Sequence, residues 1–222
     1  MKLRPIVIAI DGPAASGKGT LARRLAERFG FAHLDTGALY RATAFLVLHE
    51  KGDPADPITA EAAARRVDAQ LLEDPRLRDD EVAAAASIVA AIPEVRTALL
   101  ALQQDFAARP PAKAHGAILD GRDIGTVVCP AADLKLFITA SAEARAHRRV
   151  KELREQGAAA IYENVLQDLT ERDARDSERG AAPLAAAPDA EVIDTTTLDA
   201  ESVFAIVSNR VARMLEEKEW QQ

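Results

Sequence analysis

A glycine-rich loop near the N-terminus constrains the fold of this chain more than any other segment. Residues 12–20, Gly-Pro-Ala-Ala-Ser-Gly-Lys-Gly-Thr, follow the apolar, β-branched run 6–10. They precede an amphipathic pattern with Leu21, Leu25 and Phe29. The run predicts a strand buried on both faces, and the i, i+4, i+8 spacing predicts a helix. A strand, a glycine-rich turn and a helix in this order form a cradle in which backbone N–H groups hold phosphate.

All nine loop residues are candidates for binding ATP: Gly12, Pro13, Ala14, Ala15, Ser16, Gly17, Lys18, Gly19 and Thr20. Lys18 is expected to reach the β and γ phosphates as a point charge. The strict motif has a hydroxyl directly after the lysine, whereas here Gly19 intervenes and the hydroxyl comes at Thr20. This ending resembles the loop of nucleoside monophosphate kinases. A tight turn without a ligand is disfavoured, because the glycines, the lysine, the hydroxyl and the context agree.

Strand and helix patterns alternate along the rest of the chain. Short strands are expected at residues 31–35, 117–120, 134–138 and 191–194. Gly30 is expected to end the first helix, Thr59 and Ser141 to cap later ones, and Pro93 to be a first helical residue. Residues 57–108 are alanine-rich and helical in pattern. This alternation predicts an α/β fold with a five-stranded parallel sheet flanked by helices. The resemblance of the glycine-rich loop implies that this sheet is a P-loop kinase core.

Composition limits the classes of partner. The chain has 222 residues, and 28 Lys and Arg against 35 Asp and Glu give a net charge of −7. This balance disfavours binding to a nucleic acid polymer or an anionic membrane. The longest apolar stretch, residues 83–92, is shorter than the roughly 20 residues of a spanning helix. Asp11 interrupts the N-terminal apolar run too early for a signal peptide, so we expect a cytoplasmic protein.

The cysteine and histidine residues do not suggest a site of their own. Cys129, the single cysteine, permits no intramolecular disulfide and is interpreted as a small buried residue. The four histidines are scattered along the sequence and are interpreted as structural or surface residues: His33, His49, His115 and His147.

Two further motifs indicate a family. LDTGALYRATA (34–44) and DGRD (120–123), followed by IGTVVCP, closely resemble the bacterial cytidylate kinases. The likeness continues at ITASAEARAHRR (138–149), ERDARDSER (171–179) and the closing DTTTLD, and so covers nearly the whole chain. The family often has a longer, strand-rich stretch before Ser87, where this chain has only LLEDPRLRDDEVAAAAS. The chain therefore resembles a variant with a short insertion in the acceptor-binding domain.

The resemblance implies residues that bind the acceptor, CMP or dCMP. Asp123, Arg96 and Ser87 would read the base, since an acid suits the exocyclic amine of cytosine and a guanidinium suits its acceptors. Arg41 and Arg122 would hold the monophosphate. The other residues that it implies on this side are Thr36 near the phosphate, Arg172 and Asp176 at the ribose, Arg179 on the same wall, and Asp120.

The expected chemistry is in-line transfer of the γ-phosphoryl group of ATP to the phosphate of CMP or dCMP, without a general base. Lys18, Arg122, Arg172 and Arg175 are the candidate catalytic residues, and they act by positioning and charge neutralisation. Mg²⁺ is expected through the ATP phosphates and water, near Thr20 and Asp120, with no residue assigned to it directly. Asp120 ends a predicted strand, where P-loop enzymes usually keep an acid for the metal or its water.

The predicted organisation is one chain with a core at residues 1–40, 109–147 and 180–222. An NMP-binding insertion occupies 41–108 and an arginine-rich lid 148–179, and a monomer is expected. Arg172, Arg175 and Arg179 share one helix face. The lid could instead be a surface hairpin held by salt bridges, since residues 145–179 hold as many acids as bases.

Two other functions stay open at this point. One is a kinase for AMP or UMP on the same scaffold, and the other is an ATP-binding switch that hydrolyses nucleotide without an acceptor. The DGRD motif with Ser87 and Arg96 favours CMP over the former, and the acceptor-site motifs disfavour the latter. A GTPase is disfavoured because neither Asn164 nor Asn209 is followed by the lysine of the guanine-reading motif.

Overall fold

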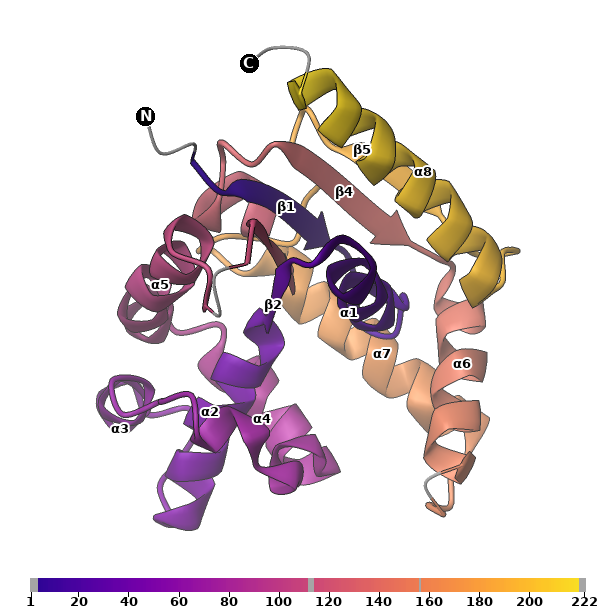
Figure 1. The fold of residues 1–222 in the computed structure, drawn as a ribbon. Coiled ribbons are helices and arrows are strands. Elements are labelled where there is room, and N and C mark those ends of the chain that lie inside the picture. Colours follow the sequence, from indigo (N-terminus) through magenta and orange to yellow (C-terminus); the bar gives the residue numbers. More distant parts are fainter. Residues whose placement is uncertain (1–3, 112–113, 156, 220–222) are drawn as a thin grey trace.

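The computed structural model describes residues 4–111, 114–155 and 157–219. Five parallel strands form one sheet in the order β2-β3-β1-β4-β5 (Figure 1). The strands are β1 (Ile6–Asp11), β2 (Ala32–Asp35), β3 (Gly116–Gly121), β4 (Leu134–Thr139) and β5 (Glu191–Asp194). The prediction of a five-stranded parallel sheet flanked by helices is therefore confirmed.

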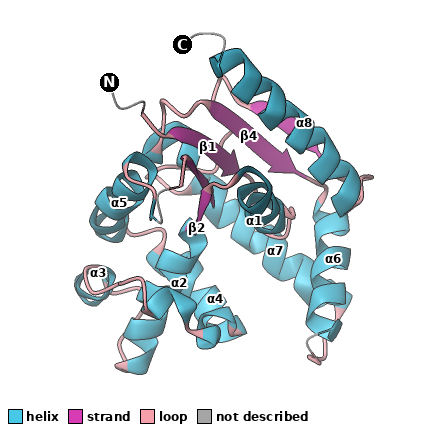
Figure 2. Cartoon of the chain, in the orientation of Figure 1, coloured by secondary structure: helices cyan, strands magenta, loops and turns pink. Residues whose placement is uncertain are grey.

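Helices connect all of these strands except β3 and β4, which are joined through a π-turn, η4 (Ile124–Val128). The helices are α1 (Lys18–Phe29), α2 (Thr36–His49), α3 (Pro57–Ala64), α4 (Asp80–Val89), α5 (Pro93–Ala108), α6 (Ala142–Glu155), α7 (Tyr162–Glu178) and α8 (Ala200–Glu219). Figure 2 shows how the helices surround the strands. Among the described residues no single helix is long and apolar enough to cross a membrane, and α4 with α5 reaches that length only as a pair bent by 100°.

The alternation of side chains along the strands explains the two sides of the core. Ala9 and Leu119 face a cluster that includes residues of α2, α4 and α5. Ile8, Ile10 and Ile118 face a second cluster with α1 and α8. Because both faces are covered, the central strand β1 is apolar from Ile6 to Ile10, as the sequence indicates.

The predicted helix boundaries hold with one correction. Gly30 ends α1 at φ +67°, Pro93 begins α5, and the Ser141 hydroxyl accepts a hydrogen bond from the third residue of α6. Thr59, however, does not cap α3. Asp56 does, because it directly precedes the proline that begins the helix and its carboxylate accepts from the Thr59 backbone N–H at 3.1 Å.

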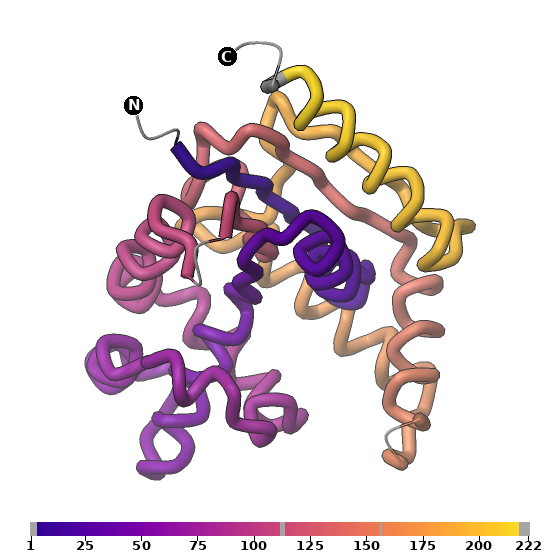
Figure 3. Tube along the Cα trace, viewed as in Figure 1, coloured from indigo at the N-terminus to yellow at the C-terminus, as the bar shows by residue number. Residues whose placement is uncertain are grey.

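The alanine-rich segment folds as several short helices and two 3₁₀ turns, η1 (Leu71–Glu73) and η2 (Pro75–Arg78). In Figure 3 this segment and the α6–α7 hairpin both extend from the sheet toward the same end of the molecule. The proposed boundaries at 40/41 and 147/148 fall inside α2 and α6. The two segments flank the carboxyl edge of the sheet, which is where ligands bind in open parallel sheets.

Candidate functional site

The phosphate loop has the backbone that the sequence predicts. Gly12 adopts φ +149°, and a Cβ there would lie 2.0 Å from the Ile138 carbonyl oxygen. Gly17, the N-cap of α1, adopts φ +88°. Only glycine tolerates both the positive φ and the close approach to Ile138 at position 12, and this lets the loop pass directly over β4 before it enters the helix. The backbone N–H groups at the start of α1 are therefore presented at the edge of the sheet.

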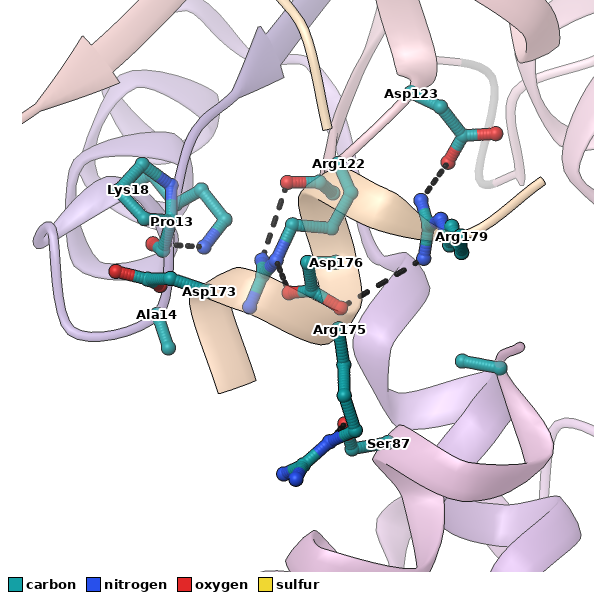
Figure 4. Close-up of polar contacts among 12 residues, drawn as sticks. Pro13, Ala14, Lys18, Ser87, Arg122, Asp123, Asp173, Arg175, Asp176 and Arg179 are labelled. Carbon is teal, nitrogen blue, oxygen red and sulfur yellow. Dashed lines mark hydrogen bonds and ion pairs between the residues drawn. The ribbon is translucent and has the colours of Figure 1, made fainter. Parts of the chain in front are cut away.

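Lys18 is the first residue of α1 and is buried, with its Nζ donating to the Pro13 carbonyl oxygen at 3.1 Å (Figure 4). Burial, with repulsion from Arg122, lowers the pKa of Lys18 to about 7. The Ser16 hydroxyl in the same loop is buried and has no hydrogen-bond partner among the described residues. A buried ammonium group and an unpartnered hydroxyl are both groups that an incoming polyphosphate would satisfy.

A cavity of about 350 Å³ lies between the phosphate loop, the ends of β2 and β3, the insertion and α7. It brings together most of the predicted site residues: Ala14, Ala15, Ser16, Gly17, Lys18, Gly19, Thr20, Thr36, Arg41, Ser87, Arg96, Asp120, Arg122, Asp123, Arg172, Asp176 and Arg179. Gly12, Pro13 and Arg175 are not part of its lining. Residues separated by more than 150 positions in the sequence thus share one space.

The wall of the cavity nearest β2 carries the side chains of Arg41 and Thr36. Arg41 on α2 forms an ion pair with Asp35 at 2.6 Å, and its Nε is buried without a hydrogen bond to any described residue. Burial opposes ionisation of Asp35, but Arg41 outweighs it and holds the pKa of Asp35 below its usual value. The Thr36 hydroxyl donates to the Asp120 carbonyl oxygen at 2.8 Å. The free Nε of Arg41 is available to an anion in the cavity.

The opposite wall presents a carboxylate and two guanidinium groups. Asp123 accepts from Arg96 Nη2 at 2.5 Å. It also lies 3.8 Å from Arg179 Nη2, as Figure 4 shows. Arg96 also donates to the Ala90 carbonyl oxygen, and its guanidinium lies 5.4 Å from the centre of the Tyr40 ring. The group is buried and rigid, so it can read the hydrogen-bonding edge of a flat ligand.

Helix α7 supplies the third side. Asp176 is buried and accepts from Arg122 Nε at 2.7 Å, with Arg179 at 3.8 Å (Figure 4). Burial opposes ionisation of Asp176, but Arg122 with the other arginines keeps its pKa below the usual value. Burial and the nearby Arg122 lower the pKa of Arg172 to about 10, and the Nε of Arg172 has no hydrogen bond within the described chain. An excess of positive charge therefore faces the cavity here.

Other arginines of α6 and α7 have partners elsewhere in the protein. Arg145 is buried and binds Asp173 at 2.5 Å and the Ala14 carbonyl oxygen at 3.2 Å, which ties the hairpin to the phosphate loop. Arg149 reaches Asp80 on α4 at 3.1 Å. Arg175 donates to the Ser87 hydroxyl at 3.1 Å and lines a neighbouring cavity of about 400 Å³ (Figure 4). The surface-hairpin alternative fits Arg149, while Arg172 and Arg179 face the main cavity.

Several residues of the site were missed. Asp35, Tyr40 and Glu152 line the cavity, and the first two belong to the 34–44 motif that carried the resemblance. His33 is interpreted from the sequence only as structural or surface; its Nε2 lies 2.8 Å from Asp120 Oδ1, a contact with a cavity residue that sequence reasoning did not anticipate. Cys129 is only half-buried, and burial raises its pKa to about 11.

The residues present fit a metal that is held mainly by phosphate oxygens. Among the described residues no cluster of three His, Cys, Asp or Glu side chains could hold a metal ion by itself. Thr20 and Asp120 both line the cavity beside the loop, as expected for a hydroxyl and a carboxylate near Mg²⁺. A hard cation that keeps several waters and binds phosphates needs no more protein ligands than these.

Comparison with known sequences decides the family. The sequence profile described as cytidylate kinase matches residues 8–213. The chain belongs to the cytidylate kinase family. It is 59% identical over 199 residues to the cytidylate kinase of Rhodospirillum rubrum, covering 90% of this chain and 93% of that protein. It is 54% identical over 208 residues to the cytidylate kinase of Granulibacter bethesdensis, covering 94% of this chain and 97% of that protein.

Among solved structures, similarity extends to the fold. A gluconokinase from Sinorhizobium meliloti superposes with a TM-score of 0.52 at 15% sequence identity, over 100% of this chain and 99% of the other. An uncharacterised protein from Eubacterium ventriosum superposes with a TM-score of 0.53 at 13% identity, over 93% and 98%. The overall fold is thus shared beyond the cytidylate kinase family.

Proposed function

We propose that this protein transfers the γ-phosphoryl group of ATP to CMP and dCMP, giving ADP and CDP or dCDP. The observation that carries the proposal is the single cavity that joins the phosphate loop to the Asp123–Arg96 pair. A carboxylate accepts from the 4-amine of cytosine, and a guanidinium donates to its O2 and N3. In uracil the amine is replaced by a carbonyl, which would face the carboxylate with no proton to donate.

The donor nucleotide fits along the phosphate loop. With the triphosphate bound to the N–H groups of α1 and to Lys18, the adenosine part of ATP would extend to the side away from the acceptor. A cavity of about 150 Å³ opens there and shares Ser16, Gly17 and Thr20 with the main cavity. Its walls are largely apolar and include Leu21, Leu198, Val203 and Phe204. An apolar slot of this kind suits an adenine ring.

The acceptor phosphate would bind between Arg41, Arg122 and Arg172, opposite the phosphate loop. The phosphate of CMP is an anion near neutral pH, so it attacks the γ-phosphorus without transferring a proton to the protein. The protein then contributes the in-line arrangement of the two phosphates and the neutralisation of charge by Lys18 and the arginines. Mg²⁺ bound to the ATP phosphates would supply further charge neutralisation, held near Thr20 and Asp120.

The acceptor specificity is tested by ADP release in a coupled assay with CMP, dCMP, UMP, AMP and GMP. We expect rapid turnover with CMP and dCMP, weaker turnover with UMP and little with the purines. Fast turnover with AMP and none with CMP would contradict the proposal and favour the other kinase. ADP release that is independent of every acceptor would favour the ATP-binding switch.

The use of dCMP rests on Asp176, which we propose to face the ribose together with Arg172. If so, Asp176→Ala changes the ratio of kcat/KM between CMP and dCMP, whereas an unchanged ratio removes Asp176 from sugar recognition. We propose that the protein acts as a monomer in the cytoplasm, where its nucleotide substrates occur. Light scattering of the purified protein with and without ATP and CMP tests the oligomeric state.

A further inference from the structure

His33 and Asp120 form a pair between two adjacent strands. His33 lies on β2 and pairs in register with Ile118, two residues before Asp120 on β3. The strands are parallel, so both side chains come to the carboxyl edge of the sheet. His33 Nε2 lies 2.8 Å from Asp120 Oδ1, and the exposed fractions of the two side chains are 22% and 5%. At this distance the ring N–H donates a full hydrogen bond to the carboxylate.

The pair orients the carboxylate toward the phosphate loop. Oδ1 of Asp120 is engaged by His33, and the Asp120 carbonyl oxygen accepts from the Thr36 hydroxyl. The second oxygen, Oδ2, faces Gly19 in the loop, where an added Cβ would lie 3.4 Å from it. The hydrogen bond from His33 holds Oδ1, and Thr36 holds the Asp120 backbone, so Oδ2 is left facing the loop.

The carboxylate needs such a partner, because the terminal torsion of an aspartate side chain is broad and turns readily. Lys18 and Arg122 both lie in the same cavity and would draw a free carboxylate to themselves. An aspartate paired with Lys18 would compete with the phosphates for that ammonium group. The hydrogen bond from His33 opposes this rotation.

We propose that His33 is a positioning residue that holds Asp120 Oδ2 toward the metal–phosphate side of the loop. The proposal deepens the proposed kinase function, because it concerns how the same site receives ATP with its metal. His33 lies outside the lining of the cavity, so it would affect the bound phosphates through Asp120 rather than by direct contact. Its removal should therefore weaken the part of ATP binding that depends on Mg²⁺ and leave the rest unchanged.

Two amide variants test the hydrogen bond with little change in polarity. In His33→Gln the side-chain amide reaches the place of Nε2, whereas in His33→Asn it is one carbon shorter. ATP affinity is measured by titration calorimetry without acceptor, once with Mg²⁺ and once with EDTA. We expect His33→Asn to lose about tenfold in affinity with Mg²⁺ and less than twofold with EDTA, and His33→Gln to retain the affinity of the parent. His115→Asn, at an exposed position before β3, is the matched control.

Asp120→Asn separates positioning from a general effect on folding. If His33 acts through Asp120, then His33→Asn has no further effect on Mg²⁺-dependent ATP affinity in the Asp120→Asn background. Equal losses with and without Mg²⁺, an undiminished effect in that background, or failure of His33→Gln to retain affinity would each overturn the proposal. Because no acceptor is present, a failure of CMP turnover would leave these measurements unaffected and would count against the proposed function alone.

Discussion

The lowered pKa of Lys18 leads to a quantitative prediction for ATP binding. The shift from the usual 10.5 to about 7 means that burial disfavours the ammonium form by on the order of 5 kcal/mol. A bound polyphosphate stabilises that form, so the pKa of Lys18 rises again in the complex. Above pH 7 the free protein therefore takes up a proton when it binds ATP. The affinity should be about twentyfold lower at pH 9 than at pH 7.5.

Titration calorimetry with ATP and no acceptor measures this effect. Between pH 7.5 and 9 the phosphates are ionised and Arg172, with a pKa of about 10, stays largely charged. Titrations in two buffers of different ionisation enthalpy should report uptake of about 0.8 proton at pH 7.5 and about one at pH 9. Lys18→Arg is the control, because its guanidinium stays protonated and its affinity should not depend on pH. A flat profile for the parent, without proton uptake, would refute a lowered pKa at Lys18.

Three further predictions concern the acceptor and the scaffold. Asp123→Ala should raise the KM for CMP about tenfold or more and leave that for ATP nearly unchanged, because it removes a buried hydrogen-bond partner worth about 1–3 kcal/mol; steady-state kinetics with each substrate varied measures both. Gly12→Ala should lower the free energy of urea unfolding by at least about 2 kcal/mol, because its Cβ would overlap the Ile138 carbonyl oxygen. Gly30→Ala, also at positive φ but with no atom within 4 Å, should cost about 1 kcal/mol. Asp11→Asn should cost about 1–3 kcal/mol, because the buried carboxylate accepts from two backbone N–H groups of η4. Burial raises the pKa of Asp11 to about 6 in the native protein. As the pH falls from 6 toward 4, the native parent therefore binds a proton that the unfolded chain does not yet bind, and the parent becomes more stable. The asparagine variant gains nothing in this way, so the difference in unfolding free energy between parent and variant should grow in that range.

The phosphate loop could be predicted because its determinants are local. Gly12, Gly17 and Lys18 lie within seven residues of one another. The positions where the backbone needs a positive φ or a close approach are occupied by the glycines, so the sequence itself marks them. The central strand β1 could be predicted for a similar reason, since it is buried on both faces and is apolar without interruption from Ile6 to Ile10. The sequence also held the signal for the cap at Asp56, because proline favours the first helical position and Asp56 directly precedes Pro57; the prediction of Thr59 rested on residue type alone.

Contacts between distant segments could not be predicted in the same way. Whether His33 meets Asp120 depends on the order of β2 and β3 in the sheet, and the sequence indicates that strands alternate with helices but not which strands are neighbours. The partner of Arg175 likewise depends on how α7 packs against α4. Its spacing from Arg172 and Arg179 suggested that all three face the same site, but Arg175 contacts Ser87 and lines the neighbouring cavity instead.

The pairing of arginines with carboxylates explains how so much positive charge is tolerated in the cavity. Arg41, Arg96 and Arg122 each use part of a planar, five-donor guanidinium to hold a carboxylate. The pairing fixes each group in place and offsets the mutual repulsion of the arginines, while the remaining N–H groups stay free for substrate. A lysine could not serve both partners in this way, because its three donors radiate from one atom and lack a fixed fork. An arginine-to-lysine exchange at any of the three positions would therefore give up either the internal ion pair or the proposed contact to the acceptor.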